Sequence, residues 1–201
     1  MLERIIMHWT AGGHKANAID KAAYHEIVEG DGDRVRGDHL PEANLSLDGG
    51  HYAAHTRGFN RGSVGLSVAA MSGAKDRPFT KGRYPIPPVQ LDAFVTVVAE
   101  YADTYGIEVT RETVLTHAEV PLTHGIAQPG KWDIRWLPDM ADGGDPLEVG
   151  DHLRMLIAAR KRELFDGGGS VLAGVDSDDF VNALSARVAE AVRDTLKTFR
   201  G

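Results

Sequence analysis

Two histidines and one aspartate occupy positions from which their side chains could act together on a bound ion. His8 follows a short apolar run at residues 5–7, and His117 follows another at residues 114–115. Such runs are typical of buried strands, so each histidine is predicted where a strand ends and a loop begins, a common place for functional side chains. Asp133 follows on the loop that leaves the second strand. Two neutral imidazoles and a carboxylate, with water in the fourth position, form the ligand set of a catalytic zinc site.

Lys131 could assist at the same site. In extended backbone, residues two apart share a face, so Lys131 and Asp133 would point the same way, with Trp132 packed on the other side. The loop between His117 and Lys131 contains prolines and glycines, which favour turns over helix. Taken one fragment at a time, plainer interpretations stay open: His8 could pack in the core, and the loop could carry a solvated lysine and aspartate at the surface.

The hydrophobic pattern predicts the elements that would position these residues. Strands are predicted at residues 3–8, 22–28, 51–55, 63–70 and 112–116. Residues 34–36 would pair with the second strand across a turn rich in aspartate and glycine. Apolar stripes of helical period predict helices at residues 89–105 and 147–164. Together these elements predict an α/β protein with a mixed central β-sheet flanked by helices.

Composition argues against several classes of function. The 201 residues, 42% of them hydrophobic, fit one domain with an appendage. A net charge of −7 without a basic cluster gives no support to nucleic-acid binding. The sequence has no cysteine, which excludes disulfides and thiolate metal sites. The N-terminus lacks the apolar core of a signal peptide, and no apolar run reaches the ~20 residues of a membrane span. We therefore expect synthesis in the cytoplasm and no membrane span.

Five short motifs, taken in their order along the chain, resemble a known enzyme family. They are His8-Trp9-Thr10-Ala11-Gly12, Tyr24-His25, His55 to Gly58 with Asn60, Ser63 and Gly65, Thr116-His117, and Lys131-x-Asp133. Over roughly residues 3–160 this order resembles the zinc-dependent N-acetylmuramoyl-L-alanine amidases of the type 2 group. That group includes the amidase-type phage lysozymes and is related to the peptidoglycan-recognition proteins. No single motif is specific, and the shared order carries the resemblance.

The resemblance implies a role for each matching residue. It implies that the ligands of Zn²⁺ are His8, His117 and Asp133. It implies that Tyr24 and Lys131 are catalytic groups beside the metal. It implies that the substrate is bound along the cleft by Thr10, His55 and Asn60. Thr116, just before a ligand, could support the metal site from behind or could simply be a strand-forming threonine.

The chain departs from the family pattern at three points. Many cell-wall amidases of this group carry a glutamate where this sequence has Ser67, so the phage-lysozyme arrangement with tyrosine and lysine fits better. The Pro-Gly that follows the third ligand in the family is replaced by residues 134–135, Ile-Arg. The loop from His117 to Lys131 is longer than usual, which leaves His124 as an alternative to Asp133 as third ligand.

The implied activity is hydrolysis of the amide bond between N-acetylmuramic acid and L-alanine of the stem peptide by a zinc-activated water. The substrate would be peptidoglycan or a muropeptide. The protein would be a phage or prophage-type endolysin that acts on the cell wall once released, and a cytoplasmic enzyme of cell-wall recycling fits the sequence equally well. Two alternatives stay open: a recognition module that binds without cleaving, and a zinc peptidase that cuts within the stem peptide. The absence of a His-Glu-x-x-His motif argues against the peptidase.

We predict three parts along the chain: a zinc amidase catalytic domain at residues 1–165, a glycine-rich linker at 166–175 and an amphipathic helix at 176–201. An acidic first turn and a single apolar stripe favour the terminal helix. Because so apolar a stripe is unfavourable in water, we expect it to pack on its own domain in a monomer. A homodimer through this helix is the first alternative, and a cell-wall anchor is the second.

Overall fold

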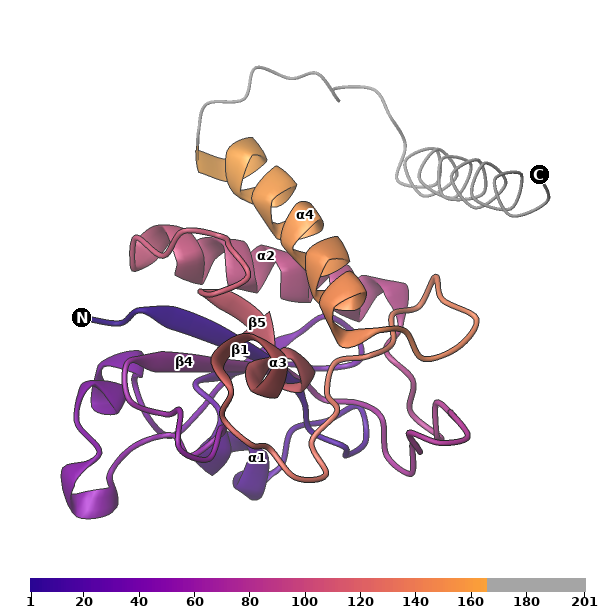
Figure 1. The fold of residues 1–201 in the computed structure, drawn as a ribbon, viewed down its shortest axis with the longest axis horizontal. Helices are drawn as coiled ribbons and strands as arrows, with labels where there is room; N and C mark the ends of the chain where they lie inside the picture. Colours follow the sequence, from indigo (N-terminus) through magenta and orange to yellow (C-terminus); the bar gives the residue numbers. More distant parts are fainter. Residues whose placement is uncertain (166–201) are drawn as a thin grey trace. The chain divides into compact units, whose positions relative to one another are not determined.

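One five-stranded mixed sheet forms the framework of the protein (Figure 1). In the computed structural model, the described residues are 1–165, so the predicted linker and terminal helix lie outside them. The strands are β1 (Arg4–Trp9), β2 (Glu26–Val28), β3 (Arg34–Arg36), β4 (Ser63–Val68) and β5 (Val114–Thr116), in the order β3-β2-β4-β1-β5. All neighbours run parallel except β3, which is antiparallel to β2. The predicted fold class is confirmed.

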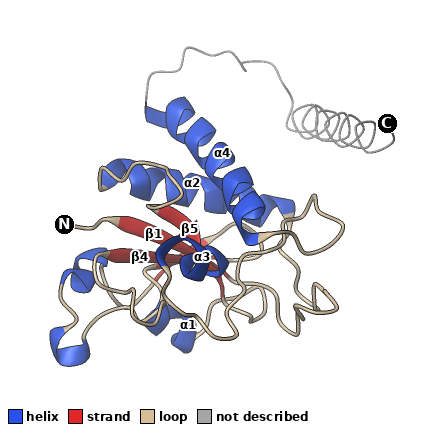
Figure 2. Ribbon diagram, in the orientation of Figure 1, coloured by secondary structure: helices blue, strands red, loops and turns tan. Residues whose placement is uncertain are grey.

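Helices cover both faces of this sheet (Figure 2). Helices α2 (Pro88–Thr104) and α4 (Pro146–Phe165) pack together on one face, whereas α1 (Ala18–Ala23) lies on the other (Figure 1). Helix α3 (Val120–His124) follows β5 after a short 3-10 turn at His117–Glu119; two further 3-10 turns span Pro41–Leu45 and Asp48–Gly50. None of the described helices is long and apolar enough to cross a bilayer.

Strand β1 is central, and its alternating side chains separate the two faces. Met7 joins the large apolar core beneath α2, together with Leu66 and Phe94. Ile6 points the other way, into a small cluster with Leu115. Because side chains two apart share a face of a strand, the next residue on the side of Ile6 is His8. The strand that buries the core therefore also delivers a histidine to the opposite face.

The structure corrects two of the predicted strands. Residues 22–24 end helix α1 instead of starting β2, because Asn17 caps this helix: its side chain accepts the backbone N–H of Asp20, and the Asp20 carboxylate accepts the N–H of Asn17. Residues 51–55 are loop, and Asn44 replaces a neighbouring strand by bonding both backbone groups of Ala53 at 3.0 Å. The hairpin and the two predicted helices are confirmed.

Candidate metal centre

His8, His117 and Asp133 meet on the face of the sheet opposite α2. One potential ligand atom of each residue lies within 4.8 Å of the others, and all three side chains are buried. The Asp133 Oδ2 atom is 3.0 Å from the His8 Nδ1 atom and 3.2 Å from the His117 Nδ1 atom. Donors around a tetrahedral zinc ion, with bonds of about 2.0–2.1 Å, lie roughly 3.3 Å apart. The spacing therefore fits the ion that the residue types suggest.

A buried ion pair holds the turn that carries His117. The Glu119 carboxylate accepts the backbone N–H of Thr116 at 2.7 Å and binds the Arg154 guanidinium of α4 at 2.7 Å. The same guanidinium donates to the Val114 carbonyl oxygen at 2.8 Å. Helix α4 approaches closely at Gly150, where a Cβ atom would lie 2.1 Å from the Glu119 carboxylate. A helix on the core side of the sheet thus fixes the position of a residue on the site side.

Asp133 reaches the site from a long loop tied down at two places. Its own carbonyl oxygen accepts the backbone N–H of Ala118 at 2.7 Å, next to the second histidine. The preceding residue, Trp132, packs edge-on against Trp9 with ring centroids 4.8 Å apart. As expected for alternating residues, the tryptophan faces the core while the aspartate faces the metal centre.

Burial and hydrogen bonding set the charges of this group. Burial lowers the pKa of His8 to about 4, although its close contact with the Asp133 carboxylate opposes the shift. Burial alone would raise the pKa of Asp133, but its close contacts with the His117 and His8 Nδ1 atoms outweigh that effect and hold the pKa well below its usual value. At neutral pH the centre therefore offers a neutral His8 imidazole and an ionised carboxylate, the protonation states that metal ligation requires.

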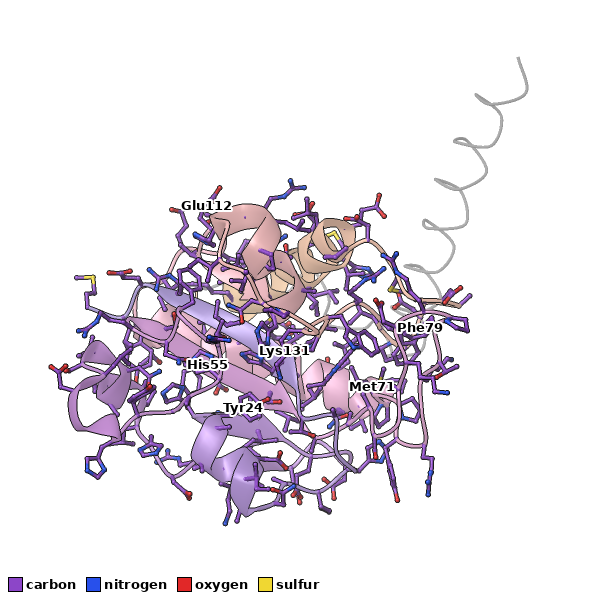
Figure 3. The ribbon with its side chains drawn as sticks, turned by 60° about the horizontal axis from the view of Figure 1, so that its bottom comes forward. Tyr24, His55, Met71, Phe79, Glu112 and Lys131 are labelled. Atoms are coloured by element: carbon purple, nitrogen blue, oxygen red, sulfur yellow. The ribbon has the colours of Figure 1, made fainter. Side chains whose placement is uncertain are left out.

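Tyr24 lies beside the metal centre, at the C-terminal end of α1 (Figure 3). Its ring centroid is 5.1 Å from that of His8. Burial, and after it the negative charge of Asp133, raise the pKa of the Tyr24 hydroxyl, so it stays a hydrogen-bond donor at neutral pH. Ser67, the residue in place of the family's glutamate, pairs with His8 across strands β4 and β1 and partly offsets this rise in the Tyr24 pKa.

Lys131 is exposed at the open side of the same region (Figure 3). Its positive charge contributes to the lowered pKa of His8, which places the ammonium within electrostatic range of the centre. Tyr24 and Lys131 thus flank the three candidate ligands, one half-buried and one open to water.

The predicted substrate-binding residues occupy supporting positions. The Thr10 hydroxyl accepts the backbone N–H groups of Gly12 and Ala70 at 3.0 and 3.3 Å and joins the ends of two central strands. Asn60 is buried, and its Oδ1 atom accepts the backbone N–H of Thr56 at 2.7 Å. His55 is also buried, with its Nδ1 atom 3.2 Å from the His8 Nε2 atom. Contact between these three residues and a substrate stays a prediction.

The alternative ligand His124 lies apart from the centre. Its Nε2 atom is 3.0 Å from the Glu112 carbonyl oxygen, and its ring packs on Phe59 with centroids 4.7 Å apart. Asp133 therefore completes the group of three. The structure also adds a residue that sequence analysis missed: the Gln128 Oε1 atom lies 3.0 Å from the His117 Nε2 atom. A glutamine within a Gly/Pro loop gives no sequence signal of such a contact.

Comparison with known proteins identifies the family. Residues 2–133 match the family model described as N-acetylmuramoyl-L-alanine amidase. No curated protein matches the chain.

Similar solved structures include the N-acetylmuramoyl-L-alanine amidase LysC from Clostridium intestinale URNW, at 14% identity and TM-score 0.42, covering 75% of this chain and 83% of that one. The Ph2119 endolysin from the Thermus scotoductus MAT2119 bacteriophage Ph2119 has 17% identity and TM-score 0.40, covering 58% and 71%. The bumblebee peptidoglycan-recognition protein PGRP-SA has 16% identity and TM-score 0.40, covering 68% and 84%. Because the family model matches well over half of the sequence, the chain belongs to the N-acetylmuramoyl-L-alanine amidase family.

Proposed function

We propose that the protein is a zinc-dependent amidase that cleaves the bond between N-acetylmuramic acid and L-alanine of the peptidoglycan stem peptide. One observation carries the proposal: three buried ligands converge at zinc-like spacing in a chain of the amidase family. Three protein ligands leave a coordination position for water, as in catalytic zinc sites, whereas structural sites use four.

Each residue of the centre has a part in the proposed reaction. His8, His117 and Asp133 would hold Zn²⁺, which supplies Lewis-acid polarisation of the scissile carbonyl and lowers the pKa of a bound water from ~15.7 towards ~7. The Tyr24 hydroxyl, kept protonated by burial, donates a hydrogen bond to the oxyanion that develops on the carbonyl. The Lys131 ammonium stabilises the same negative charge. One of these two groups also passes a proton to the leaving alanine amine.

The nature of the products tests the proposal. Purified protein incubated with soluble muropeptides should release an intact stem peptide with a free N-terminal alanine, measured by mass spectrometry. Cleavage inside the peptide would identify a zinc peptidase, and binding without any product would identify a recognition module. The presence of both Tyr24 and Lys131 beside the ligands argues against the recognition module, since binding alone requires neither an open metal position nor an oxyanion donor.

The metal content tests the cofactor. We expect about one zinc ion per chain, and removal of the ion by a chelator should abolish hydrolysis while the far-ultraviolet circular dichroism is retained, because a separate apolar core holds the fold. Active protein that contains no zinc would contradict the proposal. Activity on whole sacculi, compared with soluble muropeptides, then tests whether the enzyme acts as an endolysin on the cell wall.

A further inference from the structure

A loop that supplies no metal ligand contacts both histidines of the metal centre. His55 and Thr56 lie against the His8 Nε2 atom, at 3.2 and 3.4 Å. The backbone of Arg57 reaches the second histidine through Gln128. We call this set of contacts, formed by His55, Thr56, the Arg57 carbonyl and Gln128, the histidine clamp.

On the side of His117, the hydrogen bonds determine where the imidazole proton lies. The Gln128 Nε2 atom is 2.8 Å from the Arg57 carbonyl oxygen, which can only accept, so this end of the amide must be the donor. The other end, the Oε1 atom, therefore faces the His117 Nε2 atom at 3.0 Å. Because an amide oxygen only accepts, the His117 Nε2 atom must carry the proton. When the ring acts as a metal ligand, the lone pair is therefore on the Nδ1 atom, 3.2 Å from the Asp133 Oδ2 atom.

The same reasoning applies to His8. The His55 Nε2 atom lies 3.4 Å from the Ser63 carbonyl oxygen, which assigns the proton of a neutral His55 to Nε2. With that proton on Nε2, the His55 Nδ1 atom is an acceptor, and it also lies 2.9 Å from the Thr56 hydroxyl, which can donate to it. The His8 Nε2 atom lies 3.2 Å from this acceptor and 3.4 Å from the Thr56 hydroxyl oxygen, so it faces two acceptors and carries the proton. His8 is left in the same state as its partner, with the Nδ1 lone pair directed at Asp133.

Asn44 and strand β4 hold the clamp residues in place. The Asn44 side chain bonds the carbonyl oxygens of Ala53 and Asn60 at 3.0 and 3.1 Å, at the two ends of the loop. The His55 ring lies directly on strand β4 at Gly65, where a Cβ atom would come within 2.4 Å of the imidazole. A residue without a side chain is required there, so the ring position is built into the sheet. This rigidity is what a group that orients a ligand needs.

We propose that the histidine clamp fixes His8 and His117 as Nε2–H tautomers and so presents two Nδ1 lone pairs and one carboxylate oxygen to a single cation. Two lone pairs that face an ionised carboxylate within 3.0–3.2 Å repel one another unless a positive ion lies among them. His55 and Gln128 are accordingly positioning residues, which act on the metal site through the ligands. The inference rests on the zinc site of the proposed function but makes its own claim about metal affinity.

Two pairs of substitutions test the clamp. In each pair, one variant keeps the hydrogen-bond acceptor of the side chain and the other keeps only its size. His55→Asn keeps an acceptor near the Nδ1 position but loses the ring, whereas His55→Phe keeps a ring on Gly65 but cannot accept. Gln128→Glu keeps an acceptor oxygen for His117 but loses the donor to the Arg57 carbonyl, whereas Gln128→Leu loses both and keeps only the bulk. Removing a partner of this kind typically weakens metal binding by 10–100-fold. We therefore expect that loss for the Phe and Leu variants, with Asn and Glu much closer to the wild type.

Zinc affinity is measured by competition with a chromogenic chelator, on variants whose melting curves show a folded protein. Long-range ¹H–¹⁵N NMR of the zinc-loaded wild type should show both ligand imidazoles protonated at Nε2. If His55→Phe binds zinc as tightly as the wild type, or if His55→Asn loses as much affinity as His55→Phe, the clamp is wrong at His8. Should the His55 variants fail to fold, the Gln128 pair decides by the same criterion.

The clamp and the proposed function fail in different ways. A wild-type protein that binds zinc but releases no stem peptide contradicts the amidase proposal and leaves the clamp standing. An active amidase whose Phe and Leu variants keep full zinc affinity contradicts the clamp alone. Ligand imidazoles protonated at Nδ1 in the zinc-loaded protein would likewise overturn it.

Discussion

The two faces of the central sheet are stabilised by different interactions, apolar packing on one and hydrogen bonds on the other. Beneath α2, Met7, Leu66 and Phe94 are buried within the large apolar core. On the opposite face, the neighbouring strand residues His8 and Ser67 are equally buried but polar. Apolar burial is roughly proportional to area and has no preferred direction, whereas each buried polar atom needs a partner at a defined distance and angle. The core face therefore tolerates repacking, and the site face does not.

This difference separates stability from function. A single strand, β1, contributes to both faces with alternate residues. Substitutions on the core face should lower the free energy of unfolding and leave the metal centre intact as long as the protein folds. Substitutions on the site face should change metal binding or catalysis more than they change stability. The predictions below test that separation.

The largest effect is expected from loss of a ligand. Asp133→Ala removes the only carboxylate among the three candidate ligands and should abolish zinc binding and hydrolysis. His124→Ala is the matched control, because His124 lies against Phe59 and should affect neither property. Metal analysis after dialysis, together with product release, measures both. Loss of zinc in His124→Ala with retention in Asp133→Ala would reverse the assignment.

On the core face, Phe94→Ala should give the largest change in stability. Phe94 is 1% exposed and lies in the apolar core beneath α2, so truncation removes apolar contacts and leaves a cavity that typically costs about 3–5 kcal/mol. Val89→Ala on the same helix is the control, since Val89 is 54% exposed and should change stability by less than about 0.5 kcal/mol. Urea unfolding measures both. If folded Phe94→Ala binds zinc several-fold more weakly, the two faces are not independent.

Catalysis should be separable from metal binding within the site face itself. Tyr24→Phe and Lys131→Ala remove the two groups assigned to the oxyanion and should keep zinc while turnover falls on the order of 100–1,000-fold each. Lys161→Ala on α4 removes a lysine paired with Asp103 and should leave turnover unchanged. Steady-state kinetics with a soluble muropeptide measures the three variants. Turnover near the wild-type value in both site variants would move the oxyanion role to other residues.

The same division explains what could be predicted from the sequence. The apolar runs and stripes predict the two central strands and both large helices, because the spacing of apolar residues reflects the period and the burial of an element directly. The motif order predicted His8, His117 and Asp133, which the structure brings together. Hydrogen-bonding partners have no such sequence pattern. Gln128 and Asn44 look like any polar loop residue in the sequence, and only the structure shows their bonds. The predicted strand at residues 51–55 is wrong for that reason: the Asn44 side chain, and not a neighbouring strand, bonds the backbone there.

The smallest effect concerns a buried histidine of the site face that is not a candidate ligand. His25 accepts the backbone N–H of Gly65 at 2.9 Å and lies 3.1 Å from the Asn44 Oδ1 atom, so it is held neutral between two fixed partners. Burial lowers its pKa from 6.5 to about 4, although the bond to Asn44 opposes the shift. Between these two values the unfolded chain binds more protons than the folded protein, so the free energy of unfolding falls as the pH falls.

For His25 alone this loss amounts to about 1.5 kcal/mol between pH 6.5 and 5, because the slope rises from half of 1.36 kcal/mol per pH unit at pH 6.5 towards the full value. His25→Asn keeps an acceptor for Gly65 but has no imidazole to protonate, so urea unfolding of the metal-free variant should show a shallower decline over this range. The comparison uses the change between the two pH values, because the substitution also lowers stability at neutral pH. His51→Asn, at an exposed histidine, should leave the decline as in the wild type. An unchanged decline in His25→Asn would show that His25 is protonated without unfolding, and that this face accepts charge more readily than its hydrogen bonds indicate.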